Sequence, residues 1–178
     1  MRTFPPLTFA SIRCLTVQLC LAGLSLLGGA ARADVYDDVE RMIRNGQLER
    51  ALQASQTHLQ KSPRDPQMRL LGSRILDAQG KTDEAMGLLQ SLTVEFPELP
   101  EPHNNLAVLY ARAGRTQEAL ESLDKALLAR PDYAVALENL GDLHLSLALH
   151  AYQRASRAPA PPASALRKAN TLAPLLRR

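Results

Sequence analysis

The chain has 178 residues, of which 46% are hydrophobic and 22% charged, and it contains no tryptophan. Its formal net charge is +3, but three of its arginines and both of its cysteines lie within residues 1–33. If that segment is removed as a leader, 18 basic residues face 18 acidic ones, so the composition does not support general binding of nucleic acid. No disulfide and no thiolate metal ligand would remain.

The first 33 residues have the features of a secretory signal. Two arginines and an apolar run over residues 14–27 lead to an Ala-Arg-Ala sequence that ends at Ala33. A basic start, an apolar segment of this length and a small-residue ending predict export to the periplasm and cleavage after Ala33. An uncleaved membrane anchor is the alternative, although the run is shorter than the roughly 20 residues that span a bilayer.

Beyond this segment, three residue types recur with a period of 34. The recurring positions are a glycine, an alanine and a proline: Gly46, Gly80 and Gly114; Ala51, Ala85 and Ala119; Pro63, Pro97 and Pro131. A period of this length is typical of a stacked helix–turn–helix array. We expect each glycine to take the left-handed conformation that ends a first helix, and each proline to stop a second helix. The predicted units are residues 34–65, 66–99 and 100–133.

Within the second and third units, the turn chemistry predicts where each helix begins. The first helices are expected to run from Pro66 to Gln79 and from Pro100 to Ala113. Thr82 and Thr116 follow the glycine turns, and we expect their hydroxyls to cap the second helices by accepting hydrogen bonds from free backbone amides.

The pattern resembles the tetratricopeptide repeat (TPR) family. The third unit matches the family signature best, at Leu106, Ala107, Tyr110, Ala119, Leu123, Ala126 and Pro131. The second unit matches at Ser73, Leu76, Ala85, Leu89 and Pro97, whereas the first departs from the signature at Asp38, Ser55 and His58. The resemblance implies an all-α helix–turn–helix solenoid of about three and a half repeats plus a C-terminal capping helix. It also implies a scaffold that binds a protein or peptide in a concave groove.

The C-terminal quarter departs from the repeat. A fourth unit starts at residue 134, but no glycine turn arrives near residue 148. Residues 134–157 are therefore predicted to form one long helix, with a tight turn near Ser146 as the alternative. A Pro/Ala linker over residues 158–163 precedes a basic helix over residues 164–178, which Ser164 is expected to cap and Pro174 to end. This helix either covers the end of the stack or docks to a partner.

The first helix of each unit supplies the predicted concave face. Its residues are Tyr36, Glu40, Arg44, Leu70, Leu71, Arg74, Asp77, Asn104, Asn105, Val108, Arg112, Glu138, Asn139 and Asp142. We predict the partner-binding set within this face to be Arg74, Asn104, Asn105, Val108, Arg112, Glu138, Asn139 and Asp142. Asn105 and Asn139 are 34 residues apart, so we expect them to lie one above the other, with amides that offer both donors and acceptors to a peptide backbone.

No catalytic chemistry is indicated, and we expect no enzyme, no cofactor and no metal. The four histidines are isolated and are predicted to be packing or surface residues. The favoured function is therefore an exported scaffold or adaptor for a partner protein. An accessory subunit of an envelope enzyme or assembly complex is one alternative, and a chaperone-like holder of secreted chains is another. The sequence leaves the oligomeric state open.

Charge is segregated along the chain after the leader. Residues 34–142 carry 12 basic and 18 acidic side chains, whereas residues 143–178 carry six basic side chains and no acidic one. We expect the basic tail to fold back on the acidic body. Contact with an anionic membrane surface is the alternative.

Overall fold

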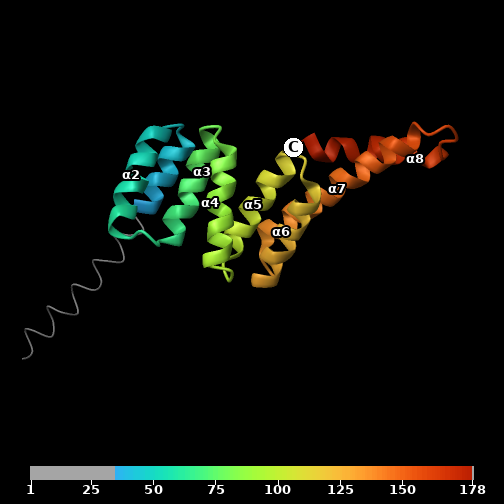
Figure 1. Ribbon diagram of the computed structural model, residues 1–178. Coiled ribbons are helices and arrows are strands. Elements are labelled where there is room, and N and C mark those ends of the chain that lie inside the picture. The colour runs from blue at the N-terminus through green and yellow to red at the C-terminus, as the bar shows by residue number, and fades with distance from the viewer. Residues whose placement is uncertain (1–34, 178) are drawn as a thin grey trace, which may run out of the picture. The chain divides into compact units, whose positions relative to one another are not determined.

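The computed structural model describes residues 35–177, so the predicted leader lies outside the described residues. The described residues form helices and no strand (Figure 1), which confirms the predicted all-α helical repeat. The chain divides after Pro63 into two compact parts, which are described separately. The helices are residues 35–44, α2 (Leu48–Lys61), α3 (Pro66–Ala78), α4 (Thr82–Glu95), α5 (Pro100–Arg112), α6 (Thr116–Ala129), α7 (Ala134–Ser156), α8 (Ala163–Leu172) and the 3-10 helix η1 (Ala173–Arg177).

Each first helix ends in the same turn around a glycine. Gly80 has φ +78°, and its N–H donates to the carbonyl of Asp77 over 2.9 Å. The N–H of Lys81 donates to the carbonyl of Leu76 over 2.9 Å. These two bonds satisfy carbonyls that the helix end would otherwise leave free, and only glycine takes the left-handed conformation without strain. The predicted glycine turns are confirmed, with φ +73° at Gly114.

The two threonines after these turns do not cap the second helices as predicted. Thr82 and Thr116 are already the first helical residues, and the residues before them make no side-chain cap hydrogen bond. The glycine turn passes directly into the helix, because the carbonyl of Lys81 already accepts the first helical bond from Ala85. The Thr82 hydroxyl instead donates to Oδ1 of Asp77 over 3.1 Å, which ties the two helices of the unit together.

Small residues hold the helices of the second part close together. Ala85 on α4 and Ala119 on α6 are fully buried, and α3 to α7 pack in sequence order. Close approach at these alanines lets larger side chains fill the seams between helices. The resulting core consists of Ala85, Met86, Leu89, Leu92, Leu106, Ala107, Leu109, Tyr110, Ala119, Leu123, Ala126 and Ala136. In the first part, Val39, Ala51 and Ser55 are buried.

The fourth unit has no internal turn. α7 continues for 23 residues, so no break occurs near Ser146. α8 and η1 pack against α7, and Figure 1 shows them returning beside it. Among the described residues, no helix combines the length and apolar character needed to cross a bilayer.

Two expectations for the tail are wrong, whereas the end of its α-helix is as predicted. α8 ends at Leu172, just before Ala173 and Pro174, and the chain continues as the 3-10 helix η1. Pro162 precedes α8 and Ser164 is its second residue, so Ser164 is not the cap. The tail also packs on α7 instead of folding back on the acidic helices, since Ala165 and Ala169 on one face of α8 supply its buried contacts.

Candidate functional site

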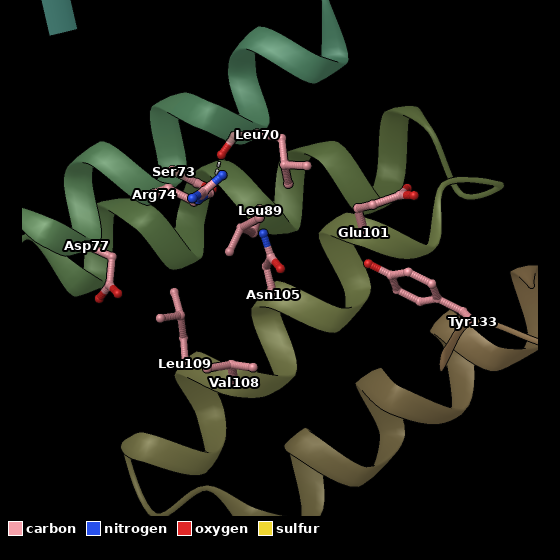
Figure 2. Close-up of a pocket in the computed structure, with 10 residues that line it drawn as sticks. All are labelled: Leu70, Ser73, Arg74, Asp77, Leu89, Glu101, Asn105, Val108, Leu109 and Tyr133. Carbon is pink, nitrogen blue, oxygen red and sulfur yellow. Dashed lines mark hydrogen bonds between the residues drawn. The ribbon is translucent and has the colours of Figure 1, made fainter. Parts of the chain in front are cut away.

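The helices α3, α5 and α7 line a groove in the second part of the chain, here called the α3–α5–α7 groove. Its first pocket, between α3 and α5, has a volume of about 360 Å³ (Figure 2). Its second pocket lies between α5 and α7 and has a volume of about 290 Å³. Val108, on α5, lines both pockets and is 37% exposed. This apolar side chain therefore lies at the junction of the two pockets.

Six of the eight predicted partner-binding residues line these pockets. They are Arg74, Asn105, Val108, Arg112, Asn139 and Asp142. Glu138 is exposed on α7 but lines neither pocket. Asn104 is only 3% exposed, so its predicted place on the open face is wrong. Asn104 precedes Asn105 on α5, and its side chain lies on the side of that helix that α7 covers.

The asparagines form a connected chain of amides. Nδ2 of Asn139 donates to Oδ1 of Asn104 over 2.8 Å, and Nδ2 of Asn104 donates to Oδ1 of Asn105 over 3.3 Å. Asn139 is thus bonded to Asn104, 35 residues away, and not directly to Asn105. The buried amide is satisfied on both sides, and its bond to Asn105 orients that side chain at the first pocket.

An ion pair crosses the groove between α3 and α5. Nη1 of Arg112 lies 2.6 Å from Oδ2 of Asp77, whose other carboxylate oxygen accepts the Thr82 hydroxyl. The Arg112 side chain is 57% exposed, so this pair contributes little to stability but holds charge of both signs at the groove wall. Arg74 is half-buried in the first pocket.

A second charged group borders the first pocket at its other end. Nη2 of Arg130 lies 3.1 Å from Oε1 of Glu101, and the Arg130 guanidinium lies 5.1 Å from the ring centre of Tyr133. Figure 2 shows the Tyr133 hydroxyl directed toward Glu101. Burial raises the pKa of Tyr133, and the Glu101 carboxylate raises it further. The phenol therefore keeps its proton at neutral pH and can donate a hydrogen bond.

Sequence reasoning missed several residues of the first pocket. Ser73, Leu89, Glu101, Leu109 and Tyr133 line it but were not predicted on the concave face. Leu89 and Leu109 are buried core residues that form the pocket floor, and Tyr133 enters from the loop before α7. Repeat columns of the first helices do not include Leu89, on the second helix α4, or Tyr133, in a loop. Ser73, Glu101 and Leu109 are on first helices but outside the residues chosen for the concave face. Conversely, Leu71 was predicted there but is buried in the core.

The first part of the chain contains the remaining predicted concave residues. The ring of Tyr36 lies 5.5 Å from that of His58, and Arg44 pairs with Glu40 over 3.3 Å. These contacts are internal to residues 35–63. They tie the helix over residues 35–44 to α2 and along its own length.

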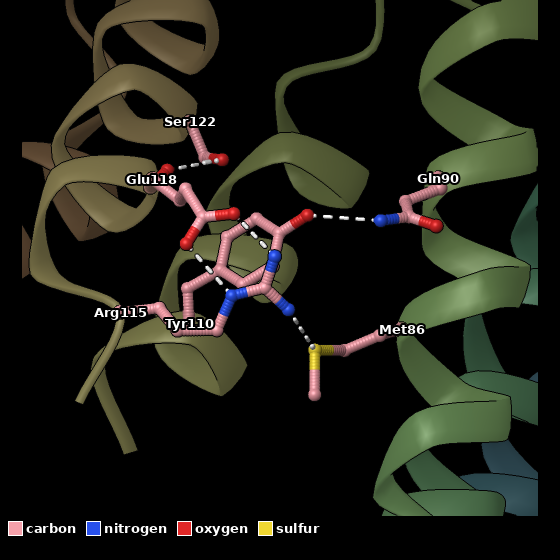
Figure 3. A network of polar contacts seen from close by, with 6 residues as sticks. All are labelled: Met86, Gln90, Tyr110, Arg115, Glu118 and Ser122. Carbon is pink, nitrogen blue, oxygen red and sulfur yellow. Dashed lines mark hydrogen bonds and ion pairs between the residues drawn. The ribbon is translucent and has the colours of Figure 1, made fainter. Parts of the chain in front are cut away.

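Tyr110 anchors a polar network between α4, α5 and α6 (Figure 3). Its hydroxyl accepts a hydrogen bond from Nε2 of Gln90 over 2.9 Å. The Arg115 guanidinium stacks 4.3 Å from the ring centre and forms two hydrogen bonds with Glu118. Hydrogen bonding to Arg115 lowers the pKa of Glu118. The network joins the second unit to the third, away from the groove residues.

The chain belongs to the tetratricopeptide repeat family. A profile of that family matches residues 42–109 and 79–141, which together cover more than half of the chain. Members are scaffolds for protein–protein and peptide interaction and are typically non-catalytic. Among the described residues, no cluster of three or more His, Cys, Asp or Glu side chains could hold a metal ion.

Solved structures share this fold. A thermophilic TPR protein of Thermus thermophilus is 21% identical, over 90% of this chain and 96% of its own, with a TM-score of 0.57. YrrB, a TPR protein with an unusual peptide-binding site, is 28% identical, over 59% of this chain and 54% of its own, with a TM-score of 0.52. A structure of Naa15/Naa10 bound to HypK-THB is 21% identical, with a TM-score of 0.58. That match covers 80% of this chain and 22% of the other.

The chain therefore spans about half the length of YrrB and less than a quarter of the matched chain in the Naa15/Naa10 structure. No curated protein matches the sequence.

Proposed function

We propose that this protein is an exported adaptor that binds an extended segment of a partner protein in the α3–α5–α7 groove. The observation that carries the proposal is the position of Val108, a partly exposed apolar side chain that lines both pockets. Asn105 lies one turn earlier on α5, where its amide can bond to a peptide backbone. YrrB, which has the highest sequence identity of the three structures, is itself a TPR protein with a peptide-binding site.

The two pockets suit a short stretch of chain. Their volumes of about 360 and 290 Å³ are each large enough for an apolar side chain. Leu70 and Leu109 supply the apolar lining of the first pocket, and Leu143 that of the second. A peptide with apolar side chains near its centre would bury them on both sides of Val108. Such a peptide is the class of ligand that this groove accommodates.

Charged residues of both signs line the groove, and they indicate which charges a partner segment can carry. Arg74 and Arg112 are accompanied by Asp77, Glu101 and Asp142 on the walls of the two pockets. Because both signs are present, the groove does not favour a strongly acidic or a strongly basic segment. We therefore propose a partner segment with charges of both signs flanking apolar residues.

The proposed location is the periplasm, after cleavage behind Ala33. The basis is the order of arginines, apolar run and Ala-Arg-Ala sequence in residues 1–33. N-terminal sequencing of protein recovered from the envelope fraction should begin at Asp34. Recovery of intact Met1 in the membrane fraction would contradict the proposed export and cleavage.

In-cell photocrosslinking tests the groove directly. A photoreactive residue in place of Val108 should capture the partner, which mass spectrometry then identifies. The matched control is the same residue in place of Val94, an 80% exposed position on α4 that lines neither pocket. Capture of the same proteins with equal yield at both positions would refute a groove site.

The captured partner allows a quantitative test. Val108→Asp places a charge where an apolar side chain is expected to pack, and it should weaken binding of the partner peptide at least tenfold in fluorescence polarisation. Val94→Asp should leave the affinity unchanged. One captured partner that co-purifies favours the adaptor or an accessory subunit. Capture of many unrelated unfolded chains would favour a chaperone-like holder.

A further inference from the structure

In the hairpin formed by α7 and α8, the stretch after Asp142 carries positive charge and no acidic residue. No Asp or Glu follows Asp142 in the sequence. The basic residues beyond it are Arg154, Arg157, Arg167, Lys168, Arg177 and Arg178. Residues 34–142 have a net negative charge, whereas residues 143–178 have a net positive charge.

Four of these cations, all within the described residues, are exposed and form no ion pair with a carboxylate. Arg154 and Arg157 lie exposed at the end of α7, and Arg167 lies exposed on α8. Among residues 35–177, none of these three arginines forms an ion pair. Lys168 is exposed as well, with its Nζ 5.0 Å from the ring centre of Tyr152. Their charge is therefore available to an anionic surface outside the chain.

Leucines accompany these cations on the outer surface of the hairpin. Ala165 and Ala169 occupy the face of α8 that packs on α7. Leu166 follows Ala165 and is 59% exposed, and Leu175 in η1 is 51% exposed. Exposure of leucine side chains to water is unfavourable. Beside cations, such side chains can insert into the boundary between lipid headgroups and acyl chains.

We propose that the α7–α8 hairpin docks on the surface of an anionic lipid bilayer. Each cation near such a surface is attracted to the anionic headgroups, and the leucines add apolar insertion. The alternative is an acidic protein surface, including the acidic helices of a second copy of this chain. Arg167 and Lys168 line a pocket between α7 and α8, but Arg154, Arg157 and the exposed Leu166 and Leu175 lie outside it. These charged and apolar groups therefore do not share one shaped pocket, which favours a lipid surface over a specific protein site.

Docking would leave the groove separate from the membrane contact. The α7 residues that line the groove end at Ser146, whereas the cations on this helix begin at Arg154. One helix therefore carries the groove wall in its first half and the lipid contact in its last turns. A membrane-bound chain could hold a partner segment at the same time, but the lipid contact does not depend on the groove.

Vesicle co-sedimentation tests the proposal with the protein as isolated from cells. Binding is compared between phosphatidylcholine vesicles and vesicles in which about a third of the lipid is phosphatidylglycerol, at about 50 mM salt. We expect binding that requires phosphatidylglycerol and is lost as salt is raised. Equal binding to both lipids, or none to either, would overturn the proposal.

Two variants locate the contact. The cation variant carries Arg154→Gln, Arg157→Gln, Arg167→Gln and Lys168→Gln. Its partition onto the anionic vesicles should be weaker by about fivefold for each cation removed. The leucine variant Leu166→Ser, Leu175→Ser should weaken partition by about tenfold without a change of charge. Circular dichroism checks that each variant keeps its helix content. The leucine variant and the salt titration still decide the matter if the cation variant does not fold.

The matched control removes the same charge elsewhere. It replaces four exposed cations outside the hairpin, as Arg50→Gln, Arg64→Gln, Lys81→Gln and Lys125→Gln. Its partition should equal that of the unaltered chain. Equal losses in the control and the hairpin variant would refute a local contact. Salt-sensitive self-association in light scattering, abolished by the hairpin variant and without vesicle binding, would assign the surface to a second copy instead.

Discussion

Asn139 on α7 donates a hydrogen bond from its Nδ2 to Oδ1 of Asn104 on α5, over 2.8 Å. Asn104 is buried, and its Nδ2 in turn donates a hydrogen bond to Oδ1 of Asn105, which lines the first pocket. The bond joins the last helix of the array to the third unit by a polar contact behind the groove wall. Asn104, in the middle of this chain of amides, is therefore structural, whereas Asn139 and Asn105 at its two ends line the two pockets.

Replacing Asn104 by alanine should destabilise the fold. We expect Asn104→Ala to lower the free energy of unfolding by about 1–2 kcal/mol, because the Asn139 amide loses its partner in a partly buried place. Urea denaturation followed by circular dichroism measures this. Asn105→Ala, at the open end of the chain, is the comparison and should cost less than Asn104→Ala, because it removes only the longer 3.3 Å bond and deletes no buried side chain. Equal midpoints for the two variants would contradict the assigned roles.

Substitution by alanine should destabilise the protein at a glycine turn and stabilise it at a glycine inside a helix. Gly114 has φ +73° and open space around its missing Cβ, so Gly114→Ala is disfavoured only by backbone conformation, by about 1–2 kcal/mol. Gly87 lies inside α4 with open space beside it, so Gly87→Ala should stabilise the fold by about 0.5–1 kcal/mol. Thermal unfolding of both variants checks the signs. A Gly114→Ala chain as stable as the unaltered one would be inconsistent with a required left-handed turn.

Tyr110 should matter for its ring more than for its hydroxyl. The residue is 7% exposed, lies in the core and carries the stacked Arg115 guanidinium. Tyr110→Ala should cost about 3–5 kcal/mol, as for other large aromatic side chains in cores. Tyr110→Phe keeps the ring and loses one hydrogen bond to the exposed Gln90, so it should cost under about 1 kcal/mol. Similar urea midpoints for the two variants would show that the packed ring is not what stabilises this seam.

His103 should make stability depend on mild acid. Burial lowers the pKa of His103, and Lys125 lowers it further, while a hydrogen bond to the backbone of Pro97 acts in the opposite sense. The unfolded chain, with the ordinary value near 6.5, therefore binds the proton more readily than the folded chain. This contribution is fully present above about pH 6.5 and is lost as pH falls through the lowered folded value.

The measurement is the free energy of unfolding between about pH 7 and pH 5. The unaltered chain should lose stability over this window, and His103→Gln should lose less. Identical pH profiles for the two chains would show that His103 does not contribute to acid sensitivity.

Much of the fold could be predicted from the sequence because its signals are local. Glycine ends a helix through its own backbone freedom, and Gly46, Gly80 and Gly114 all have positive φ. Small residues at fixed spacing mark close helix crossings, and Ala85 and Ala119 are fully buried. The prediction for Thr82 was wrong because the local sequence allows α4 to begin either at Thr82 or just after it. The hydrogen bonds of the glycine turn make Thr82 the first helical residue.

The groove could be predicted only in part. Repeat columns identified eight residues that line its pockets, six of them in the predicted partner-binding set, since equivalent positions of stacked helices share one face. They did not separate Asn104 from Asn105, or Leu71 from Leu70. Adjacent positions differ by about 100° around a helix, and the exposure of each depends on how the next helix crosses it.

The sequence alone determines that this protein is a helical repeat of the TPR family, because the residues that turn and stop its helices act within a few positions of themselves. Only the tertiary structure decides that Asn104 is buried against α7, that Tyr133 enters the first pocket, and that the basic tail packs on α7 rather than on the acidic helices. These outcomes depend on contacts between residues far apart in the chain, where helix crossings and side-chain volume select one arrangement among several that the local pattern permits.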